Sequence, residues 1–120
     1  MAKAMSTDMY NGGLDRMANC TTQTILSQEP TSIADISTYR LANVAMTFAT
    51  DYTFAAGDVN GRKLTVATKS NVPITATGNA THVSLDNGSG WVVTTCNNQI
   101  LTQGGTVTIQ SWKREIADPT

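Results

Sequence analysis

Three residues whose chemistry could serve catalysis stand at alternate positions of this chain. His82, the single histidine, is followed at steps of two by Ser84 and Asp86. On a β-strand all three share one face, and together they are the residue types of a hydrolytic triad. Same-face neighbours on a strand lie roughly 6.5–7 Å apart, however, whereas a nucleophile and its base need about 2.6–3.2 Å. The spacing therefore predicts a strand histidine and no catalytic relay.

The remaining reactive residues form no recognisable motif. Two cysteines and one histidine lack the spacing of a metal site, and no glycine-rich loop leads into a helix to bind phosphate. Most of the aspartates stand beside turn or helix-cap residues, where they stabilise the backbone. The seven aspartates of the chain are Asp8, Asp15, Asp35, Asp51, Asp58, Asp86 and Asp118. We expect no catalytic, cofactor-binding or metal-binding residues, no cofactor and no enzymatic activity.

The two cysteines and two tryptophans have structural interpretations. Cys20 and Cys96 are expected to be free thiols in a protein made in the cytoplasm. A disulfide between them, which would tie the N-terminal segment to the rest, stays open. Trp91 and Trp112 are expected to be core or interface anchors, and a role in stacking on a ligand is the alternative.

The first twenty residues differ from the rest, because they contain four of the five methionines and no β-branched run. Met9, Leu14 and Met17 can share one face of a short helix over about residues 7–18. Gly12 and Gly13 weaken that helix, so it needs a surface on which to dock. We therefore divide the chain into an N-terminal helical segment or arm, residues 1–20, and a β-domain, residues 21–120. The sequence leaves open whether the segment packs on its own domain or on a neighbouring subunit.

The rest of the chain alternates apolar and polar residues in short runs separated by turn residues. Asn60-Gly61 and Asn87-Gly88 are dipeptides that favour tight turns, and Gly78-Asn79, Asn97-Asn98 and Gly104-Gly105 mark further breaks. Ser32 and Asp35 resemble a helix capping box. Residues 39–48 fit neither the helical nor the strand period. The predicted strands are 21–28, 63–68, 72–77, 80–86, 91–96 and 106–116. This pattern predicts a mainly β fold, an antiparallel β-sandwich or small barrel with a short N-terminal helix or extended arm.

The predicted core comprises the inward-facing apolar residues of these strands. They are Leu64, Val66, Val83, Leu85, Trp91, Val93, Val107 and Ile109.

Composition favours a protein that is packed against neighbours. Only 14% of the residues are charged, against about 25% in a typical soluble domain, and the net charge is −1. A weakly charged surface repels copies of itself little, and charge is depleted at interface cores. The balance of charges gives no electrostatic footprint for nucleic acid, and no apolar run is long enough to span a membrane. Residues 1–10 lack the apolar core of a signal peptide, which predicts synthesis in the cytoplasm.

Several segments resemble small virion proteins encoded in the structural-gene clusters of tailed bacteriophages. The segments are VNGRKLTVAT (59–68), ITATGNATHVSLDNGSG (74–90), WVVTTC (91–96) and LTQGGTVTIQSWKREIADP (101–119). The resemblance covers most of the chain and consists mainly of strand and turn patterns. It implies a non-enzymatic β-domain present in many copies in the virion, and it supplies no binding residues.

The resemblance does not fix the part of the particle. The leading hypothesis is a head decoration (cement) subunit that binds the capsid surface, because a compact β-domain can rest on the shell while the N-terminal segment reaches across a neighbour. A tail, neck or fibre-attachment component is one alternative, and a carbohydrate- or host-surface-binding β-sandwich module is another. The expected partners are other virion proteins, either the major capsid protein or neck and tail proteins, and further copies of this chain in a homo-oligomer. Neither nucleic acid nor membrane is expected as a partner. The sequence does not determine position in the particle, symmetry or copy number.

Overall fold

The computed structural model describes residues 14–59 and 61–116, and it is mainly β with antiparallel pairing throughout. The described strands form three sheets. The first is four-stranded, in the order β2 (Arg40–Ala45), β1 (Thr22–Leu26), β6 (Gly78–Asp86), β7 (Trp91–Leu101). The second has the order β3 (Tyr52–Ala56), β4 (Arg62–Val66), β9 (Trp112–Ile116). The third pairs β5 (Lys69–Pro73) with β8 (Thr106–Ile109).

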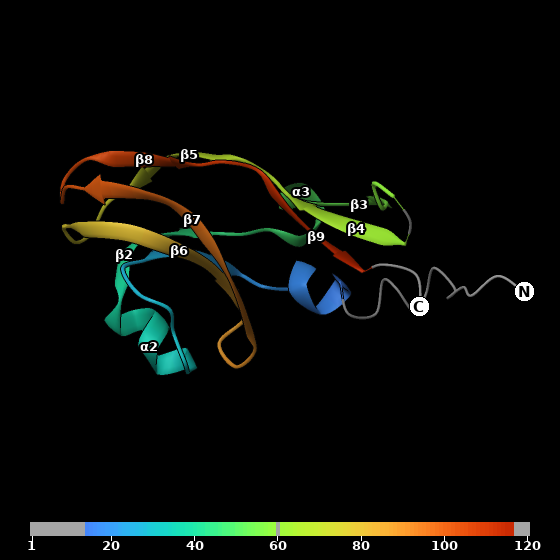
Figure 1. The fold of residues 1–120 in the computed structure, drawn as a ribbon, viewed down its shortest axis with the longest axis horizontal. Coiled ribbons are helices and arrows are strands. Elements are labelled where there is room, and N and C mark those ends of the chain that lie inside the picture. Colours follow the sequence, from blue (N-terminus) through green and yellow to red (C-terminus); the bar gives the residue numbers. More distant parts are fainter. Residues whose placement is uncertain (1–13, 60, 117–120) are drawn as a thin grey trace, which may run out of the picture.

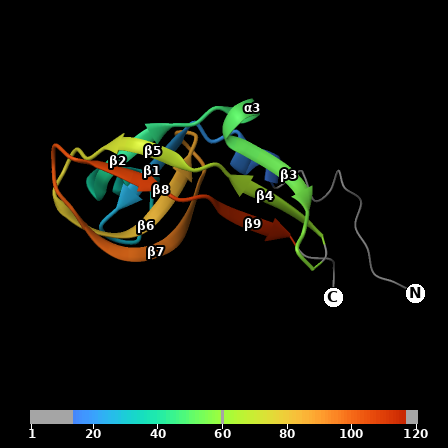
Figure 2. The ribbon, with the colours of Figure 1, turned by 90° about the horizontal axis from the view of Figure 1, so that it is seen from above.

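The sheets pack in a sandwich-like arrangement. The β5–β8 pair lies over the four-stranded sheet, and the β3–β4–β9 sheet continues toward one end of the molecule (Figure 1, Figure 2). A single bridge between Ala42 and Ile74 joins the β2 edge of the four-stranded sheet to the chain just after β5. The opposite edges, β7 and β8, are not paired with each other in the described ladders, so these strands do not close a barrel. The prediction of a mainly β, antiparallel fold is confirmed.

The helices are short. Two of them are α2 (Ile33–Thr38) and α3 (Phe48–Asp51). The predicted capping box of α2 is confirmed, because Ser32 Oγ accepts a hydrogen bond from the Asp35 amide at 3.3 Å. The Asp35 carboxylate in turn accepts from the Thr31 amide at 2.9 Å. The Thr31 hydroxyl donates to the same carboxylate at 2.8 Å, and the two hydrogen bonds hold the pKa of Asp35 below its usual value.

The N-terminal helix prediction is confirmed for its second half, since residues 14–18 are helical. Residues 7–13 lie outside the described part of the chain. Leu14, Met17 and Ala18 are buried among Leu64 and Leu85, so this helical turn belongs to the core of its own chain. Residues 39–48, which fit neither period, divide into β2 and the start of α3.

Two predicted turns depend on residues that adopt positive φ. Gly61 has φ 73° and Gly88 has φ 93°, values that residues with a Cβ atom rarely adopt. Asn87 Oδ1 accepts hydrogen bonds from the amides of Ser89 and Gly90, which closes the β6–β7 turn.

Two of the predicted breaks between strands are wrong. Gly78-Asn79 begins β6, and Asn97-Asn98 lies inside β7 rather than ending it. Around Asn97 the ladder shifts register, since Ala80 pairs with Gln99 while His82 pairs with Thr95. The turn-forming asparagines therefore make a bulge within a continuous strand.

The predicted single strand over residues 106–116 is two strands. β8 pairs with β5, whereas β9 pairs with β4 in a different sheet. Ser111 marks the junction, where its Oγ donates to the Val66 carbonyl at 2.8 Å. Where a chain passes from one sheet to another, its hydrogen-bonded pairing is interrupted. The alternation of apolar and polar residues does not report that interruption. The predicted run 72–77 likewise overlaps only the end of β5, which stops at Pro73.

Two apolar clusters form the core. The first joins residues 14–20 to the β3–β4–β9 sheet, and its members are Leu14, Met17, Ala18, Cys20, Met46, Tyr52, Leu64, Val66 and Leu85. The second lies between the four-stranded sheet and the β5–β8 pair, and its members are Ile25, Leu41, Ala42, Val72, Ile74, Ala80, Val83, Leu101 and Ile109. Trp112 is half-buried and packs against both clusters.

Five of the eight predicted core residues are buried: Leu64, Val66, Val83, Leu85 and Ile109. The prediction is wrong for Trp91, which is 36% exposed, and Val93 and Val107 are only half-buried. β7 and β8 each have one unpaired edge, so their side chains lack neighbours on that side. Periodicity identifies the face of a strand but not its place in the sheet.

A buried polar contact joins the two ends of the sandwich. Gln23 on β1 is fully buried, and its Oε1 accepts a hydrogen bond from Trp112 Nε1 on β9 at 2.8 Å. Its Nε2 contacts Met46 Sδ at 3.6 Å. The side chain thus fixes the tryptophan that both apolar clusters share.

Replacement of this amide should be costly. Gln23→Leu keeps most of the side-chain volume but leaves Trp112 Nε1 without its acceptor, and we expect a loss of about 1–3 kcal/mol in the free energy of unfolding. Urea denaturation followed by circular dichroism measures it. Gln28→Leu makes the same change at an exposed position and should leave stability nearly unchanged. Equal stability of the two variants would contradict the role given to Gln23.

A second buried polar contact ties α3 to β5. The Asp51 side chain is 6% exposed, and its Oδ1 pairs with Lys69 Nζ at 2.7 Å. Its Oδ2 accepts from the Thr47 amide at 2.6 Å. Burial alone would raise the pKa of Asp51, but the hydrogen bonds from Lys69 and Thr47 outweigh it and hold the pKa below its usual value.

This depressed pKa makes stability depend on acidity. The unfolded carboxyl titrates near pH 3.9, so the stabilisation from Asp51 is complete above that pH and is lost as the pH falls through the lower folded value. We expect the free energy of unfolding to fall between about pH 5 and pH 2, and to fall less steeply in Asp51→Asn. Chemical denaturation across this range measures both slopes. Parallel slopes would show that Asp51 is not the responsible group.

Candidate functional site

The structure places the three alternating residues of β6 at every second pair of the ladder with β1. His82 is opposite Leu26, Ser84 opposite Thr24, and Asp86 opposite Thr22. His82 Nδ1 lies 2.8 Å from Thr81 Oγ1, and Asp86 Oδ2 accepts from the Gly88 amide at 3.0 Å. Each of these two side chains has a partner other than Ser84, and the arrangement is structural.

Ser84 is the exception within this group. Its side chain is fully buried, and its Oγ has no hydrogen-bond partner among the described residues. It lies between Thr24 on β1 and Val93 on β7 in the middle of the four-stranded sheet. A buried hydroxyl without a partner lowers stability, because the hydrogen bonds it makes to water in the unfolded chain are lost.

The cysteines are free and lie in different clusters. Cys20 is buried in the first cluster and Cys96 packs against the second. Burial, together with the nearby charge of Asp86, raises the pKa of Cys20 to about 11, and burial also raises the pKa of Cys96. Within residues 14–59 and 61–116, no three His, Cys, Asp or Glu side chains gather closely enough to hold a metal ion.

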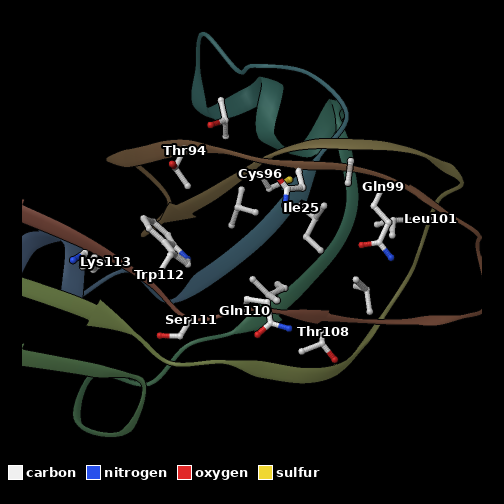
Figure 3. A pocket seen from close by; sticks show the side chains of 16 residues that line it. Ile25, Thr94, Cys96, Gln99, Leu101, Thr108, Gln110, Ser111, Trp112 and Lys113 are labelled. Atoms are coloured by element: carbon white, nitrogen blue, oxygen red, sulfur yellow. The ribbon is translucent and has the colours of Figure 1, made fainter.

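The most distinctive surface is a groove between β7 and the β8–β9 segment, which we call the β7–β8 groove. It has a volume of about 370 Å³. Figure 3 shows side chains from both walls converging on it, with Trp112 and Lys113 at one end and Leu101 toward the other. Its floor belongs to the second apolar cluster and consists of Ile25, Val83, Leu101 and Ile109. Its rims are polar and comprise Thr95, Asn97, Gln99, Thr108 and Gln110.

Both walls of the groove are strands with one unpaired edge. In the described sheets β7 is hydrogen-bonded only to β6, and β8 only to β5. Each free edge presents backbone N–H and C=O groups that a further strand can pair with. An apolar floor between two such edges is suited to an extended polypeptide, which would supply backbone hydrogen bonds and alternate side chains.

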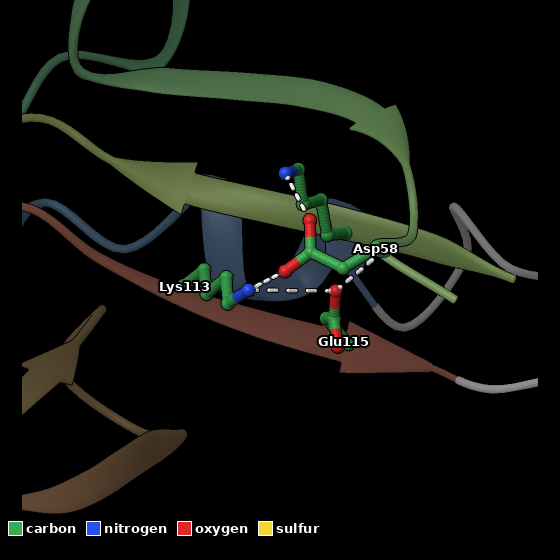
Figure 4. Close-up of polar contacts among 4 residues, drawn as sticks. Asp58, Lys113 and Glu115 are labelled. Atoms are coloured by element: carbon green, nitrogen blue, oxygen red, sulfur yellow. Dashed lines mark hydrogen bonds and ion pairs between the residues drawn. The ribbon is translucent and has the colours of Figure 1, made fainter. Parts of the chain in front are cut away.

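Charge is distributed unevenly between the sheets. From Asn87 through Trp112 the sequence contains no charged residue, and this stretch includes all of β7 and β8. The β3–β4–β9 sheet carries a cluster of charges instead (Figure 4). There Asp58 pairs with Lys63 at 2.7 Å and with Lys113, and the Asp58 amide donates to Glu115 at 2.9 Å. These exposed pairs contribute little stability individually.

The sequence reasoning above did not identify the β7–β8 groove. A groove between two strands depends on which edges stay unpaired, and the alternating pattern does not report pairing. One signal was available in the uncharged stretch from Asn87 through Trp112. Because edge strands are usually protected by charged residues, its length indicates edges that are covered or paired.

Comparison with protein families, with curated proteins and with solved structures gives no match for this chain. In the part of the chain that the structure describes, no helix is both long and apolar enough to cross a membrane.

The unpartnered hydroxyl of Ser84 leads to a stability prediction. Ser84→Ala removes a buried polar atom and little volume, so we expect the free energy of unfolding to stay equal or rise by about 1 kcal/mol. Thermal and urea denaturation measure the change. Ser111→Ala removes a hydroxyl that does have an acceptor and should destabilise instead. A clear loss of stability in Ser84→Ala would mean that its hydroxyl has a partner in solution.

Proposed function

We propose that this chain is a non-enzymatic structural subunit of a tailed-bacteriophage virion, and specifically a head decoration protein that binds the capsid surface. The observation that carries the proposal is the β7–β8 groove, an apolar floor between two uncharged and unpaired strand edges. Such a surface is suited to pairing with other polypeptides. The resemblance of residues 59–68, 74–96 and 101–119 to small virion proteins supports the same assignment.

A decoration protein needs a surface that can bind many neighbours, and the low charge of this chain suits that need. A decoration subunit gains affinity from many equivalent contacts, each of modest area, which repeat over a symmetric shell. Low charge reduces repulsion between adjacent copies, because like charges at an interface are unfavourable. The charged cluster around Asp58 lies on the β3–β4–β9 sheet and meets the groove only at the end where Lys113 lies.

A tail, neck or fibre-attachment component would present the same kind of surface. Copy number distinguishes these positions, because a shell repeats a decoration site far more often than a neck or tail ring repeats its subunits.

A carbohydrate- or host-surface-binding module is the second candidate, and it rests on a different observation. Trp91 is 36% exposed and lines a cavity of about 360 Å³ together with Asn87, Arg16 and Arg114. An exposed indole beside polar side chains can stack on a sugar ring. Binding to a glycan array that Trp91→Ala abolishes would favour this candidate over the virion assignment.

Copy number in purified particles is the decisive test of the proposed function. For a head decoration protein we expect hundreds of copies per virion, because the icosahedral shell repeats its surface sites. Quantitative mass spectrometry against isotope-labelled peptides, with the major capsid protein as internal standard, measures the number. A count near a small multiple of three, five or six would move the protein to the neck, tail or fibres. Absence from the particles would overturn the virion assignment.

A further inference from the structure

β7 is the longest strand of the described fold and has a free edge along its whole length. It runs over eleven residues, and in the ladders it is paired only with β6. The other described edge strands are shorter: β8 has four residues, β3, β5 and β9 have five each, and β2 has six. β2 is also bridged to the chain after β5 through Ala42 and Ile74.

The composition of β7 lacks the usual protection of an edge strand. Its sequence, WVVTTCNNQIL, contains neither a charged residue nor a proline. Natural edges are commonly blocked by lysine, proline, bulges or a covering segment. β7 has only the bulge around Asn97, opposite Thr81, and regularly paired segments flank it on both sides. The strand is therefore open to pairing with another strand.

Exposed apolar side chains mark the two ends of the same strand. Trp91 at its beginning is 36% exposed, and Ile100 near its end is 78% exposed. These are two of the four large exposed hydrophobic residues in the described chain, the others being Phe48 and Val59. When two copies of such an edge pair antiparallel, the apolar groups at both ends can become buried.

We propose that β7 pairs antiparallel with β7 of a second copy around a two-fold axis near Cys96. Full overlap of the two strands centres on residue 96, because positions 91 and 101 are equally far from it. In this register Trp91 of each copy is opposite Leu101 of the other and Ile100 is opposite Val92, and symmetry repeats both apolar pairs. It also makes the two four-stranded sheets continuous through backbone hydrogen bonds.

Charge favours this partner. No charged residue lies on β7, so two copies meet at this edge without electrostatic repulsion. A strand of a different protein would pair with the backbone equally well, but it would not by itself account for apolar residues at both ends of the edge. The proposal deepens the proposed function by naming one partner of this surface. It is tested on the isolated protein, so its failure is distinguishable from absence of the protein from virions.

The first experiment uses Cys96 as a native probe. A short bismaleimide joins two thiols that lie close together, and in the proposed dimer the two Cys96 side chains flank the two-fold axis. We expect covalent dimers to form with the wild-type protein and with Cys20→Ser, but not with Cys96→Ser. Peptide mapping should find the cross-link between two copies of the peptide containing Cys96. Cross-linking through Cys20, or none at all, would overturn the proposed pairing.

The second experiment measures association directly. Sedimentation equilibrium over a range of concentrations should show a monomer–dimer equilibrium for the wild-type protein. Thr95→Lys places two like charges near the axis and should weaken dimerisation by about tenfold or more. Ile100→Ser should weaken it as well, by removing an exposed apolar contact. Both positions are exposed, so the monomer fold should be retained, as circular dichroism would verify.

A matched control separates this edge from a general effect of charge. Thr53 is an exposed threonine on β3, the edge strand of a different sheet, and Thr53→Lys makes the same change there. Dimerisation that survives Thr53→Lys and is lost in Thr95→Lys supports pairing through β7. A wild-type protein that stays monomeric at all concentrations, or equal effects of the two lysines, would overturn the proposal. So would a monomer that pairs at this edge only with another virion protein.

Discussion

The hydrogen bond between Gln23 and Trp112 is the constraint on which the arrangement of the sheets depends. It joins β1 in the four-stranded sheet to β9 in the three-stranded sheet, across 89 positions of sequence. Trp112 contacts both apolar clusters, so its orientation determines how the two halves of the core meet. The buried amide of Gln23 needs a partner, and the half-buried indole of Trp112 supplies it. The contact thus provides specificity as well as stability, because a displaced Trp112 would leave the buried Gln23 oxygen without a donor.

The fold class was predictable from the sequence because local rules and tertiary structure agree over most strands. Alternation in β4 and β6, the capping residues before α2, and the glycines at positions 61 and 88 each report a local preference that the fold retains. The sequence-based prediction and the structure disagree where strand pairing, rather than local preference, determines the structure. Asn97 and Asn98 favour a turn, but the ladder with β6 continues past them as a bulge. Residues 106–116 have the sequence pattern of one strand but form two strands, which belong to different sheets.

The candidate site was less predictable, for a related physical reason. The residues with recognisable chemistry, His82, Ser84 and Asp86, lie within a ladder and have structural surroundings. The β7–β8 groove instead arises from two strand edges without partners, and its floor is ordinary core. No residue type marks such a surface. Only the uncharged stretch from Asn87 through Trp112 indicates it, because sequences that leave edges exposed to water usually add charge there.

The position of β9 at the end of the fold affects how the chain reaches its native state. β9 follows all the other described strands in sequence, yet the first cluster is incomplete without the strand that carries Trp112. The other described strands must therefore be synthesised before the three-stranded sheet can form. Contacts between residues far apart in sequence slow folding, and the first sheet is exposed to other nascent chains during that delay. Folding and assembly thus compete for the same strand edges, and rapid docking of β9 favours the correct outcome.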